Sequence, residues 1–280
     1  MPVSPLISVE ELHRRLEAGD GIRLLDVRYG LDAPDGRAPH SAGHLPGAVY
    51  VDMDTELATH GEPSEGRHPL PSRETLQEAA RRWGLSEGDS VVVYDDYRSV
   101  AAARAWWLLR RAGVEDVRVL DGGLSAWTTS GLPLETGEVS PPRGSIVLRD
   151  PAGGVTIDDA AAWPERGLLL DARAPERYRG EVEPYDPIPG HIPGARNLPA
   201  DALLDGDAFA PPAAIREAFA GVGATGADPV AAYCGSGLTA AHTALAGEVA
   251  GIEVAVYPGS WSQWSNTPGR PVATGAEPGA

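Results

Sequence analysis

The sequence predicts an α/β fold of two tandem domains, each a mostly parallel sheet flanked by helices. Its 280 residues are about twice the length of a typical domain. Several short blocks recur in the same order in the two halves, and in each half short apolar runs alternate with stretches of helical character.

The repeat consists of four matching blocks at nearly constant spacing. LLDVR returns as LLDAR, GHLPGAV returns as GHIPGAR, and two later pairs keep the same order. The pairs begin at Leu24 and Leu169, Gly43 and Gly190, Ser90 and Asp228, and Leu120 and Val256. Four blocks in one order indicate a tandem duplication.

Helix and strand signals recur through both copies. Ser8 and Glu11 form a capping-box pattern at the start of a helix over Ser8–Ala18, and two later helices, Ser72–Trp83 and Arg98–Ala112, each end before a glycine. Apolar runs rich in Val and Leu suit buried parallel strands. These runs are Arg23–Val27, Val91–Tyr94 and Val117–Leu120 in the first copy, and Leu168–Ala172, Val230–Tyr233 and Val254–Tyr257 in the second.

The segment between the copies, residues 138–154, is rich in Pro and Gly and has no clear hydrophobic period. We therefore expect a linker there. This places the first domain at residues 5–137 and the second at residues 155–275.

Composition excludes several function classes. All 23 basic side chains are arginine, which excludes Schiff-base chemistry and the lysine of a phosphate loop. The single cysteine, Cys234, excludes an intrachain disulfide and a Cys-rich zinc site. A net charge of −17 argues against nucleic acid as a partner, and no stretch approaches the roughly 20 apolar residues of a spanning helix. We expect a cytoplasmic protein with no cofactor, no metal and no membrane association.

The duplication separates residues of the fold from candidates for chemistry. Three polar positions occur in both copies: Asp26 and Asp171, Arg28 and Arg173, and His44 and His191. We expect these pairs to fix the strand ends and the GHxPG turns. Cys234, by contrast, aligns with Asp95, so the candidate nucleophile occurs in the second copy alone.

Cys234 has the surroundings of a reactive thiol. It ends an apolar run and leads into Gly-Ser-Gly and a helix-compatible stretch, which predicts a strand, a tight loop and a helix N-terminus. Gly235 and Gly237 would allow positive φ and let backbone N–H groups turn toward the sulfur. Together with the helix N-terminus, this favours a thiolate. The alternative is an inert buried cysteine, which leaves the two glycines unexplained.

The repeated LLDxR and GHxPGA blocks and the loop CGSGLTA resemble the tandem-domain rhodanese superfamily of sulfurtransferases, over about residues 5–275. The resemblance implies an inactive first domain and a second domain whose cysteine carries a sulfane sulfur as a persulfide. The acceptor would be cyanide, a small thiol or a protein thiol, such as that of a thioredoxin-like protein. The residues of the loop expected at the substrate are Gly235, Gly237, Leu238 and Thr239.

The resemblance also bears on the sulfur donor. In the thiosulfate-preferring branch basic residues commonly follow the cysteine, whereas Gly235 and Ser236 follow it here. This favours 3-mercaptopyruvate, with thiosulfate as the alternative. Arg177 matches the family's substrate-binding arginine and could grip a carboxylate, unless it forms a structural salt bridge; Arg179 is a weaker alternative. The mercaptopyruvate branch often has a second arginine where this chain has Tyr185, which favours a broader donor preference.

The same branch implies a proton-transfer trio of serine, histidine and aspartate. Ser236 matches the serine, Asp54 the aspartate and His68 the histidine. A hydroxyl beside the sulfur could protonate the enolate of departing pyruvate. The alternative for His68 is an exposed loop position, and we expect His242 to be packed within the fold.

Two other function classes fit the sequence less well. A cysteine-dependent phosphatase needs an arginine six residues after its cysteine, where this chain has Ala240. A noncatalytic binding module would not need Cys234.

Overall fold

The computed structural model describes residues 4–151, 153–226 and 228–279, and the chain divides into two compact units. Unit 1 comprises Met1–Thr59, Leu70–Ala152 and Gly206–Phe209. Unit 2 comprises His60–Pro69, Gly153–Asp205 and Ala210–Ala280. The segment His60–Pro69 therefore groups with the second unit although it lies in the first half of the sequence. The predicted domain ranges, 5–137 and 155–275, do not include this regrouping.

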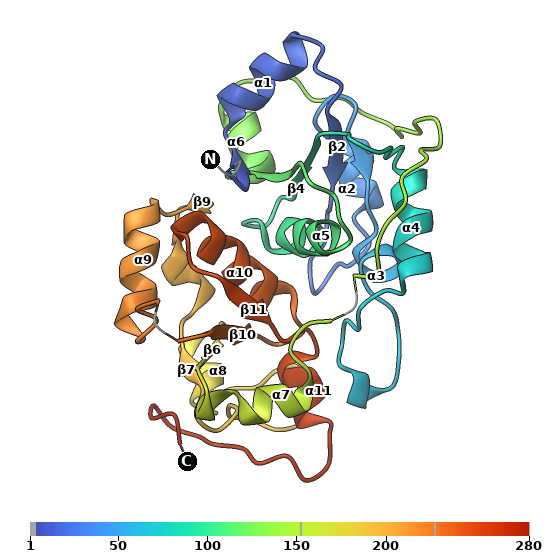
Figure 1. Ribbon diagram of the computed structural model, residues 1–280. Coiled ribbons are helices and arrows are strands. Elements are labelled where there is room, and N and C mark those ends of the chain that lie inside the picture. Colours follow the sequence, from blue (N-terminus) through green and yellow to red (C-terminus); the bar gives the residue numbers. More distant parts are fainter. Residues whose placement is uncertain (1–3, 152, 227, 280) are drawn as a thin grey trace. The chain divides into compact units, whose positions relative to one another are not determined.

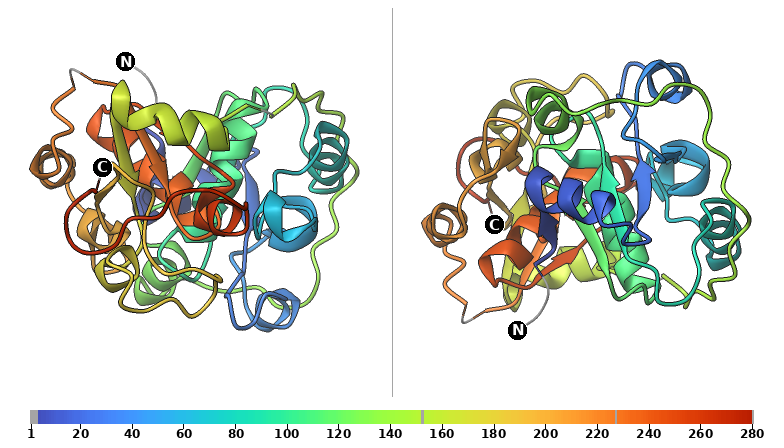
Figure 2. Two further views of the ribbon diagram at one scale, coloured as in Figure 1. Left: turned by 90° about the horizontal axis from the view of Figure 1, so that it is seen from below. Right: turned by 90° about the horizontal axis from the view of Figure 1, so that it is seen from above.

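Unit 1 is built on a sheet of five parallel strands in the order β1-β5-β4-β2-β3 (Figures 1 and 2). The strands are β1 (Leu6–Ile7), β2 (Arg23–Asp26), β3 (Val49–Tyr50), β4 (Val91–Tyr94) and β5 (Val117–Leu120). The helices are α1 (Val9–Glu17), α2 (Arg37–Ala42), α3 (Met53–Glu56), α4 (Arg73–Arg82), α5 (Val100–Arg111) and α6 (Gly123–Thr129).

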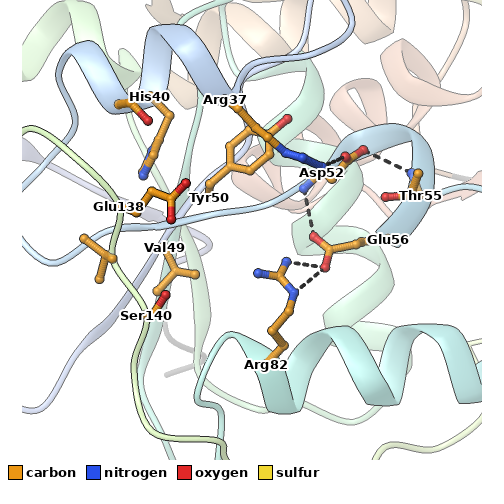
Figure 3. Close-up of a pocket in the computed structure, with 12 residues that line it drawn as sticks. Arg37, His40, Val49, Tyr50, Asp52, Thr55, Glu56, Arg82, Glu138 and Ser140 are labelled. Carbon is orange, nitrogen blue, oxygen red and sulfur yellow. Dashed lines mark hydrogen bonds and ion pairs between the residues drawn. The ribbon is translucent and has the colours of Figure 1, made fainter.

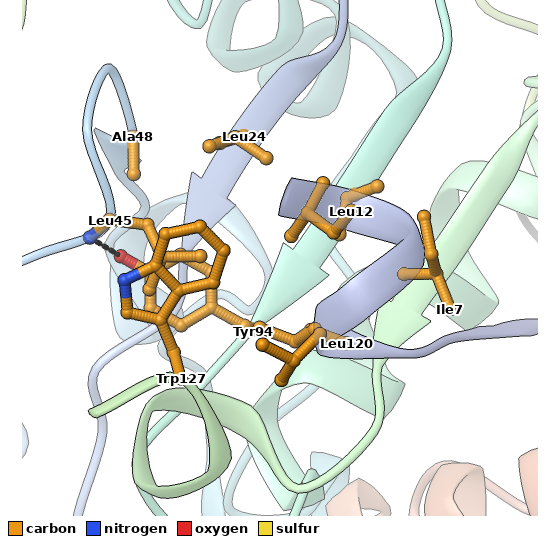
Figure 4. Packing of buried hydrophobic residues seen from close by; sticks show 10 residues of the cluster. Ile7, Leu12, Leu24, Leu45, Ala48, Tyr94, Leu120 and Trp127 are labelled. Atoms are coloured by element: carbon orange, nitrogen blue, oxygen red, sulfur yellow. Dashed lines mark hydrogen bonds between the residues drawn. The ribbon is translucent and has the colours of Figure 1, made fainter. Parts of the chain in front are cut away.

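One hydrophobic cluster of unit 1 fixes α1 and α6 against the sheet. Leu12 of α1 and Trp127 of α6 pack with Leu24 and Tyr94 from the central strands, all of them buried (Figure 4). Burial of a large apolar side chain contributes about 2–3 kcal/mol, so such clusters hold the layers together.

The start of α1 follows the predicted capping pattern in part. The Ser8 hydroxyl accepts the backbone N–H of Glu11 at 3.2 Å, as expected. The Glu11 carboxylate, however, binds Arg118 Nη1 at 2.7 Å, which draws it away from the backbone of Ser8. The predicted capping box is therefore half formed, because a charged partner competes for the glutamate.

Unit 2 repeats this architecture with a parallel sheet of order β11-β10-β6-β7 (Figure 1). Its sheet strands are β6 (Leu168–Asp171), β7 (Arg196–Asn197), β10 (Val230–Tyr233) and β11 (Val254–Val256), and β8 (Leu204–Asp205) is a short strand outside this sheet. The short strand β9 (Ala208–Phe209) falls in the Gly206–Phe209 segment of unit 1. Its helices are α7 (Ile157–Ala162), α8 (Pro175–Tyr178), α9 (Pro212–Gly221), α10 (Leu238–Ala250) and α11 (Ser260–Ser265), with short 3₁₀ turns η1 (Pro63–Glu65), η2 (Trp163–Glu165) and η3 (Ala200–Leu203). The η1 turn packs against α11, which attaches the 60–69 segment to this unit.

The expected linker contains neither helix nor strand among its described residues, but part of it is bound to unit 1. The N–H groups of Ile146 and Arg149 donate to the carbonyls of Leu85 and Ala112, at 3.0 and 2.8 Å. The Ile146 side chain is buried. This part of the segment is thus packed on unit 1 and is not a flexible linker.

The duplicated polar residues fix the strand ends and turns, as predicted. In unit 1, Arg28 Nε lies 3.0 Å from Asp26 Oδ1, and its Nη2 donates to the carbonyl of Gly43 at 2.7 Å. In unit 2, Arg173 makes the same two contacts with the matching aspartate and glycine, at 2.6 Å each. These arginines tie the end of a central strand to the first residue of GHxPG.

Candidate active site

Cys234 directly follows β10, and the loop after it closes onto the start of α10. Its side chain is buried, and the sulfur accepts the backbone N–H of Gly237 at 3.1 Å. Gly237 has φ of +89°, and a Cβ there would lie 2.4 Å from the carbonyl oxygen of Pro258. The loop therefore requires glycine at this position.

Gly235 serves a different purpose from the one predicted. It does not have positive φ, so the expectation of a left-handed conformation is wrong for this residue. A Cβ at Gly235 would instead lie 3.4 Å from Nη1 of Arg177 and 3.8 Å from Nη1 of Arg67. The missing side chain leaves room between the cysteine loop and two guanidinium groups.

Ser260 is a site residue that the sequence reasoning missed. Its hydroxyl accepts the N–H of Cys234 at 3.1 Å, donates to the carbonyl of Tyr257 at 2.8 Å and lies 4.0 Å from the sulfur. Ser260 is fully buried with φ of +54°, a conformation that costs a non-glycine residue about 1–2 kcal/mol. The structure matches Ser260 to Gly123 of unit 1, because the N–H groups of the next residues, Leu124 and Trp261, donate to the carbonyls of Asp95 and Cys234.

Arg177, the predicted carboxylate clamp, lies in α8 and is held by acidic neighbours. Its Nη2 lies 2.6 Å from Glu183 Oε1 and 3.4 Å from Asp186 Oδ2, and its guanidinium lies over the ring of Tyr185. These contacts leave Nη1 facing the cysteine loop, so a salt bridge and a ligand contact are compatible. Arg179 binds Glu181 instead, on the exposed surface.

Arg67 is the second residue that the sequence reasoning missed. Its backbone N–H donates to the hydroxyl of Ser262 at 2.9 Å, and its Nη2 binds Asp186 Oδ1 at 2.6 Å. Its guanidinium lies 5.5 Å from the ring centre of Tyr185. In the sequence, the only pointer to this segment was the neighbouring His68, a predicted member of the proton-transfer trio. Nothing in the local pattern indicates that Arg67 has a partner in the second copy.

The site is a network of alternating charges. Arg173 joins it through Glu183, whose Oε2 lies 3.1 Å from Arg173 Nη1. Glu183 and Asp186 then bind Arg177, and Asp186 binds Arg67. Burial raises the pKa of Asp186 above its ordinary value, and Arg67 opposes the shift.

The predicted proton-transfer trio is distributed over both units. Ser236 and His68 belong to unit 2 and are 8% and 5% exposed, so the alternative of an exposed loop position for His68 is wrong. Asp54 lies in α3 of unit 1, and its pairing with His68 stays a prediction. His242 is fully buried in α10, as expected.

Two further loop residues were expected at the substrate. Leu238 is buried and opens α10. Thr239 is partly buried, and its carbonyl accepts the hydroxyl of Thr243 at 3.1 Å. Their contribution to substrate binding stays a prediction.

The matching loop of unit 1 is filled by the carboxylate of Asp95. One oxygen accepts the N–H groups of Tyr97 and Ser99, at 3.0 and 2.9 Å. The other accepts the N–H groups of Ala101 and Ala102 in the first turn of α5, both at 2.9 Å. The group is fully buried, and burial raises its pKa to about 6 against the opposing hydrogen bonds of the loop.

A separate cavity of about 340 Å³ lies in unit 1 and contains none of the predicted site residues (Figure 3). Its two arginines are already paired, Arg37 with Asp52 and Arg82 with Glu56. Elsewhere in the described ranges, no three His, Cys, Asp or Glu side chains are grouped so as to hold a metal ion. None of the helices described has the length and apolar character needed to cross a membrane.

Comparison with known proteins places this site in a family. The model of the rhodanese-like domain matches residues 8–130 and again residues 156–267. A Mycobacterium tuberculosis protein, whose name assigns it to the thiosulfate sulfurtransferases, is 46% identical over 96% of this chain and 97% of its own length. Human 3-mercaptopyruvate sulfurtransferase is 37% identical over 91% of this chain and 89% of its own.

Solved structures agree with the sequence relatives. The crystal structure of a 3-mercaptopyruvate sulfotransferase from Escherichia coli superposes with a TM-score of 0.83 at 31% identity, covering 92% of this chain and 99% of that one. Both the family model and these relatives cover nearly the whole chain. The chain therefore belongs to the rhodanese family of sulfurtransferases and carries the rhodanese-like domain twice.

Proposed function

We propose that this chain moves a sulfane sulfur from a small anionic donor, through a persulfide on Cys234, to a thiophilic acceptor. The favoured donor is 3-mercaptopyruvate, and thiosulfate is the alternative. The observation that carries the proposal is the surroundings of the only cysteine. Its sulfur accepts an N–H at the start of α10, and two guanidinium groups face the same loop.

The first half-reaction loads the sulfur. The Cys234 thiolate attacks the sulfur of 3-mercaptopyruvate, an S–S bond forms, and the C–S bond breaks with its electron pair on carbon. The resulting enolate takes a proton and leaves as pyruvate. With thiosulfate, the S–S bond of the donor breaks and sulfite leaves with the electron pair.

The cysteine loop and the predicted trio of Ser236, His68 and Asp54 have proposed roles in this step. Backbone N–H groups of the loop stabilise the negative charge on sulfur, and the hydroxyl of Ser236 supplies the proton to the enolate. His68, with Asp54, would orient that hydroxyl and replace its proton. The donor would lie against the loop residues Gly235, Gly237, Leu238 and Thr239.

The second half-reaction unloads the sulfur. Cyanide or a thiol attacks the outer sulfur, the S–S bond breaks, and Cys234 leaves as thiolate. The chain has no second cysteine to resolve the persulfide, so it persists until an external acceptor arrives. A thioredoxin-like protein in a reducing compartment such as the cytoplasm is an acceptor of this kind.

The choice of donor depends on the loop. The names of the relatives include both thiosulfate and 3-mercaptopyruvate sulfurtransferases. In this chain Gly235 and Ser236 follow the cysteine, where a doubly charged donor would profit from adjacent basic residues. The planar forks of arginine match a carboxylate, which favours 3-mercaptopyruvate.

The test is a two-donor comparison on the purified chain with cyanide as acceptor. We expect a higher kcat/KM for 3-mercaptopyruvate than for thiosulfate, and a gain of about 32 Da on Cys234 after donor alone. Equal or reversed values would overturn the donor choice. Wild-type transfer by Cys234→Ser would overturn the mechanism itself.

A second variant tests the proton donor. Ser236→Ala should lower kcat for 3-mercaptopyruvate about 10-fold or more, because the enolate loses its acid. Thiosulfate turnover needs no such proton and should change less than about 2-fold. Intact mercaptopyruvate turnover would remove Ser236, His68 and Asp54 from the mechanism.

A further inference from the structure

Arg67 lies beside the cysteine loop although it is distant in sequence. Its Nη1 is 3.8 Å from the point where a Cβ on Gly235 would stand, and Arg177 Nη1 is 3.4 Å from that point. The two guanidinium groups therefore border one small space next to Cys234.

Three guanidinium nitrogens lie within 4 Å of this point; Nη2 of Arg177, at 3.6 Å, is paired within the unit, and the two Nη1 atoms are not. Nη2 of Arg67 binds Asp186, and Nη2 of Arg177 binds Glu183 and Asp186. Neither Nη1 has a hydrogen-bond partner in the part of the chain that the structure describes. The side chains of Arg67 and Arg177 are 25% and 16% exposed, and unpaired guanidinium N–H groups with such limited access to water are strong donors for an anion.

A short acidic segment sets the positions of both arginines. Asp186 binds Arg67 with one carboxylate oxygen and Arg177 with the other, at 2.6 and 3.4 Å. The ring of Tyr185 lies 5.5 Å from the Arg67 guanidinium and 5.2 Å from that of Arg177. Both guanidinium groups therefore make a cation–π contact with the ring of Tyr185, which is favourable for each.

We propose that Arg67 is the second cation of the donor site, and that its Nη1 and that of Arg177 together bind the anionic end of the sulfur donor. Asp186 is the positioning residue for both. The inference rests on the proposed function and names the groups that recognise the donor. It also explains Tyr185, because the cation expected at that position is supplied by the 60–69 segment.

The first test is kinetic, with 2-mercaptoethanol as a neutral acceptor. Arg67→Met should raise KM for 3-mercaptopyruvate about 10- to 100-fold, the loss expected for one charge-assisted hydrogen bond. The kcat/KM for the acceptor should stay within about 2-fold, because the acceptor meets an enzyme that is already loaded. Arg179→Met is the matched control and should leave both constants unchanged.

The second test moves the cation instead of removing it. Tyr185→Arg in the Arg67→Met background should recover at least about 10-fold in donor KM, because a guanidinium is restored to the same space. A merely structural role for Arg67 would not be rescued in this way. Failure to rescue, combined with lowered thermal stability of Arg67→Met, would overturn the inference.

The third test does not need turnover. Cys234 is the only cysteine, so its alkylation by anionic iodoacetate and by neutral iodoacetamide can be compared by mass spectrometry. The ratio of the two rates should fall about 10-fold in Arg67→Met. An unchanged ratio would overturn the cation site. If the wild type transfers no sulfur from either donor, the proposed function fails, while a lowered ratio would still support the anion site.

Discussion

The loops that follow the central strands and end at the N-cap of the next helix, residues 95–99 in unit 1 and 234–237 in unit 2, differ by one residue in length and in the group they surround. In unit 1 the Asp95 carboxylate accepts four backbone N–H groups of its own loop and helix. In unit 2 the side chain of Cys234 is smaller than a carboxylate, and its sulfur accepts one backbone N–H, from Gly237. A loop closed by a fixed anion has no room for a substrate, whereas a loop around a thiol can receive one.

A second difference lies in the first residue of α6 in unit 1 and of α11 in unit 2. Gly123 in unit 1 and Ser260 in unit 2 have almost the same φ, +55° and +54°. The φ of this residue is therefore shared, although the preceding residues differ, with φ of +74° at Gly122 and −64° at Gly259. The serine hydroxyl is an addition that contacts Cys234. The strain of a non-glycine residue there is confined to the unit that holds the thiol.

The largest expected effect comes from giving unit 2 the anion of unit 1. Cys234→Asp should lower sulfur transfer more than about 1,000-fold, because the nucleophile is replaced by a carboxylate that binds the loop amides. Thermal unfolding should stay close to wild type, because a carboxylate after β10 can accept N–H groups of the loop and of the start of α10, as Asp95 does with the start of α5. Measurable transfer by this variant would contradict the assignment of Cys234.

The reciprocal change tests whether the cysteine alone is sufficient. Asp95→Cys in the Cys234→Ser background should not restore transfer. In unit 1 the next residue is Asp96, whose carboxylate lies 3.8 Å from Arg28 and would repel an anionic donor. Restored activity would show that the cations near Gly235 are dispensable.

The next effect concerns the stability of unit 1. Asp95→Ala should lower the free energy of unfolding by about 2–4 kcal/mol, because four buried N–H groups lose their acceptor. Asp96→Ala, at an exposed neighbouring position, is the control and should cost less than about 0.5 kcal/mol. Urea unfolding followed by circular dichroism measures both.

The same variant has a defined pH dependence. The pKa of Asp95 is raised from 3.8 to about 6, so its contribution to stability is fully present below 3.8 and is lost as the pH rises through 6. Asp95→Ala should therefore cost about 1 kcal/mol more at pH 5 than at pH 7. A cost that grows toward neutral pH would contradict burial as the cause of the raised pKa.

The smallest expected effect comes from making unit 2 resemble unit 1 at Ser260. Ser260→Gly should change the free energy of unfolding by less than about 1 kcal/mol, because the relief of positive φ offsets the two hydrogen bonds lost, from the N–H of Cys234 and to the carbonyl of Tyr257. Sulfur transfer should fall about 10-fold, since the N–H of Cys234 loses the hydroxyl that orients the loop. Unchanged kinetics would assign the serine to the fold alone.

The parts of the fold that local pattern governs could be predicted from the sequence. The apolar runs at Arg23, Val91 and Val117 became β2, β4 and β5 to within one residue, because buried parallel strands have continuous apolar sequences. The strand, tight loop and helix around Cys234 were likewise predicted from the neighbouring residues, whereas Arg177 was predicted from the resemblance to the rhodanese superfamily. Ser260 could have been found by asking which residue occurs in one copy alone.

Arg67 could not be predicted by such reasoning. Its segment leaves the unit of its sequence neighbours and joins the other, so its main partner Asp186 is 119 residues away. Such a contact is set by tertiary packing, here that of η1 on α11, and has no local period or spacing.

The closed loop of unit 1 has a consequence for the loaded form of unit 2. The carboxylate oxygens of Asp95 stand two bonds beyond Cβ, and the outer sulfur of a persulfide on Cys234 would stand at the same bond count. Unit 1 thus shows four backbone N–H groups of a loop and helix start gathered on an anion at that bond count, in a loop one residue longer than that of unit 2.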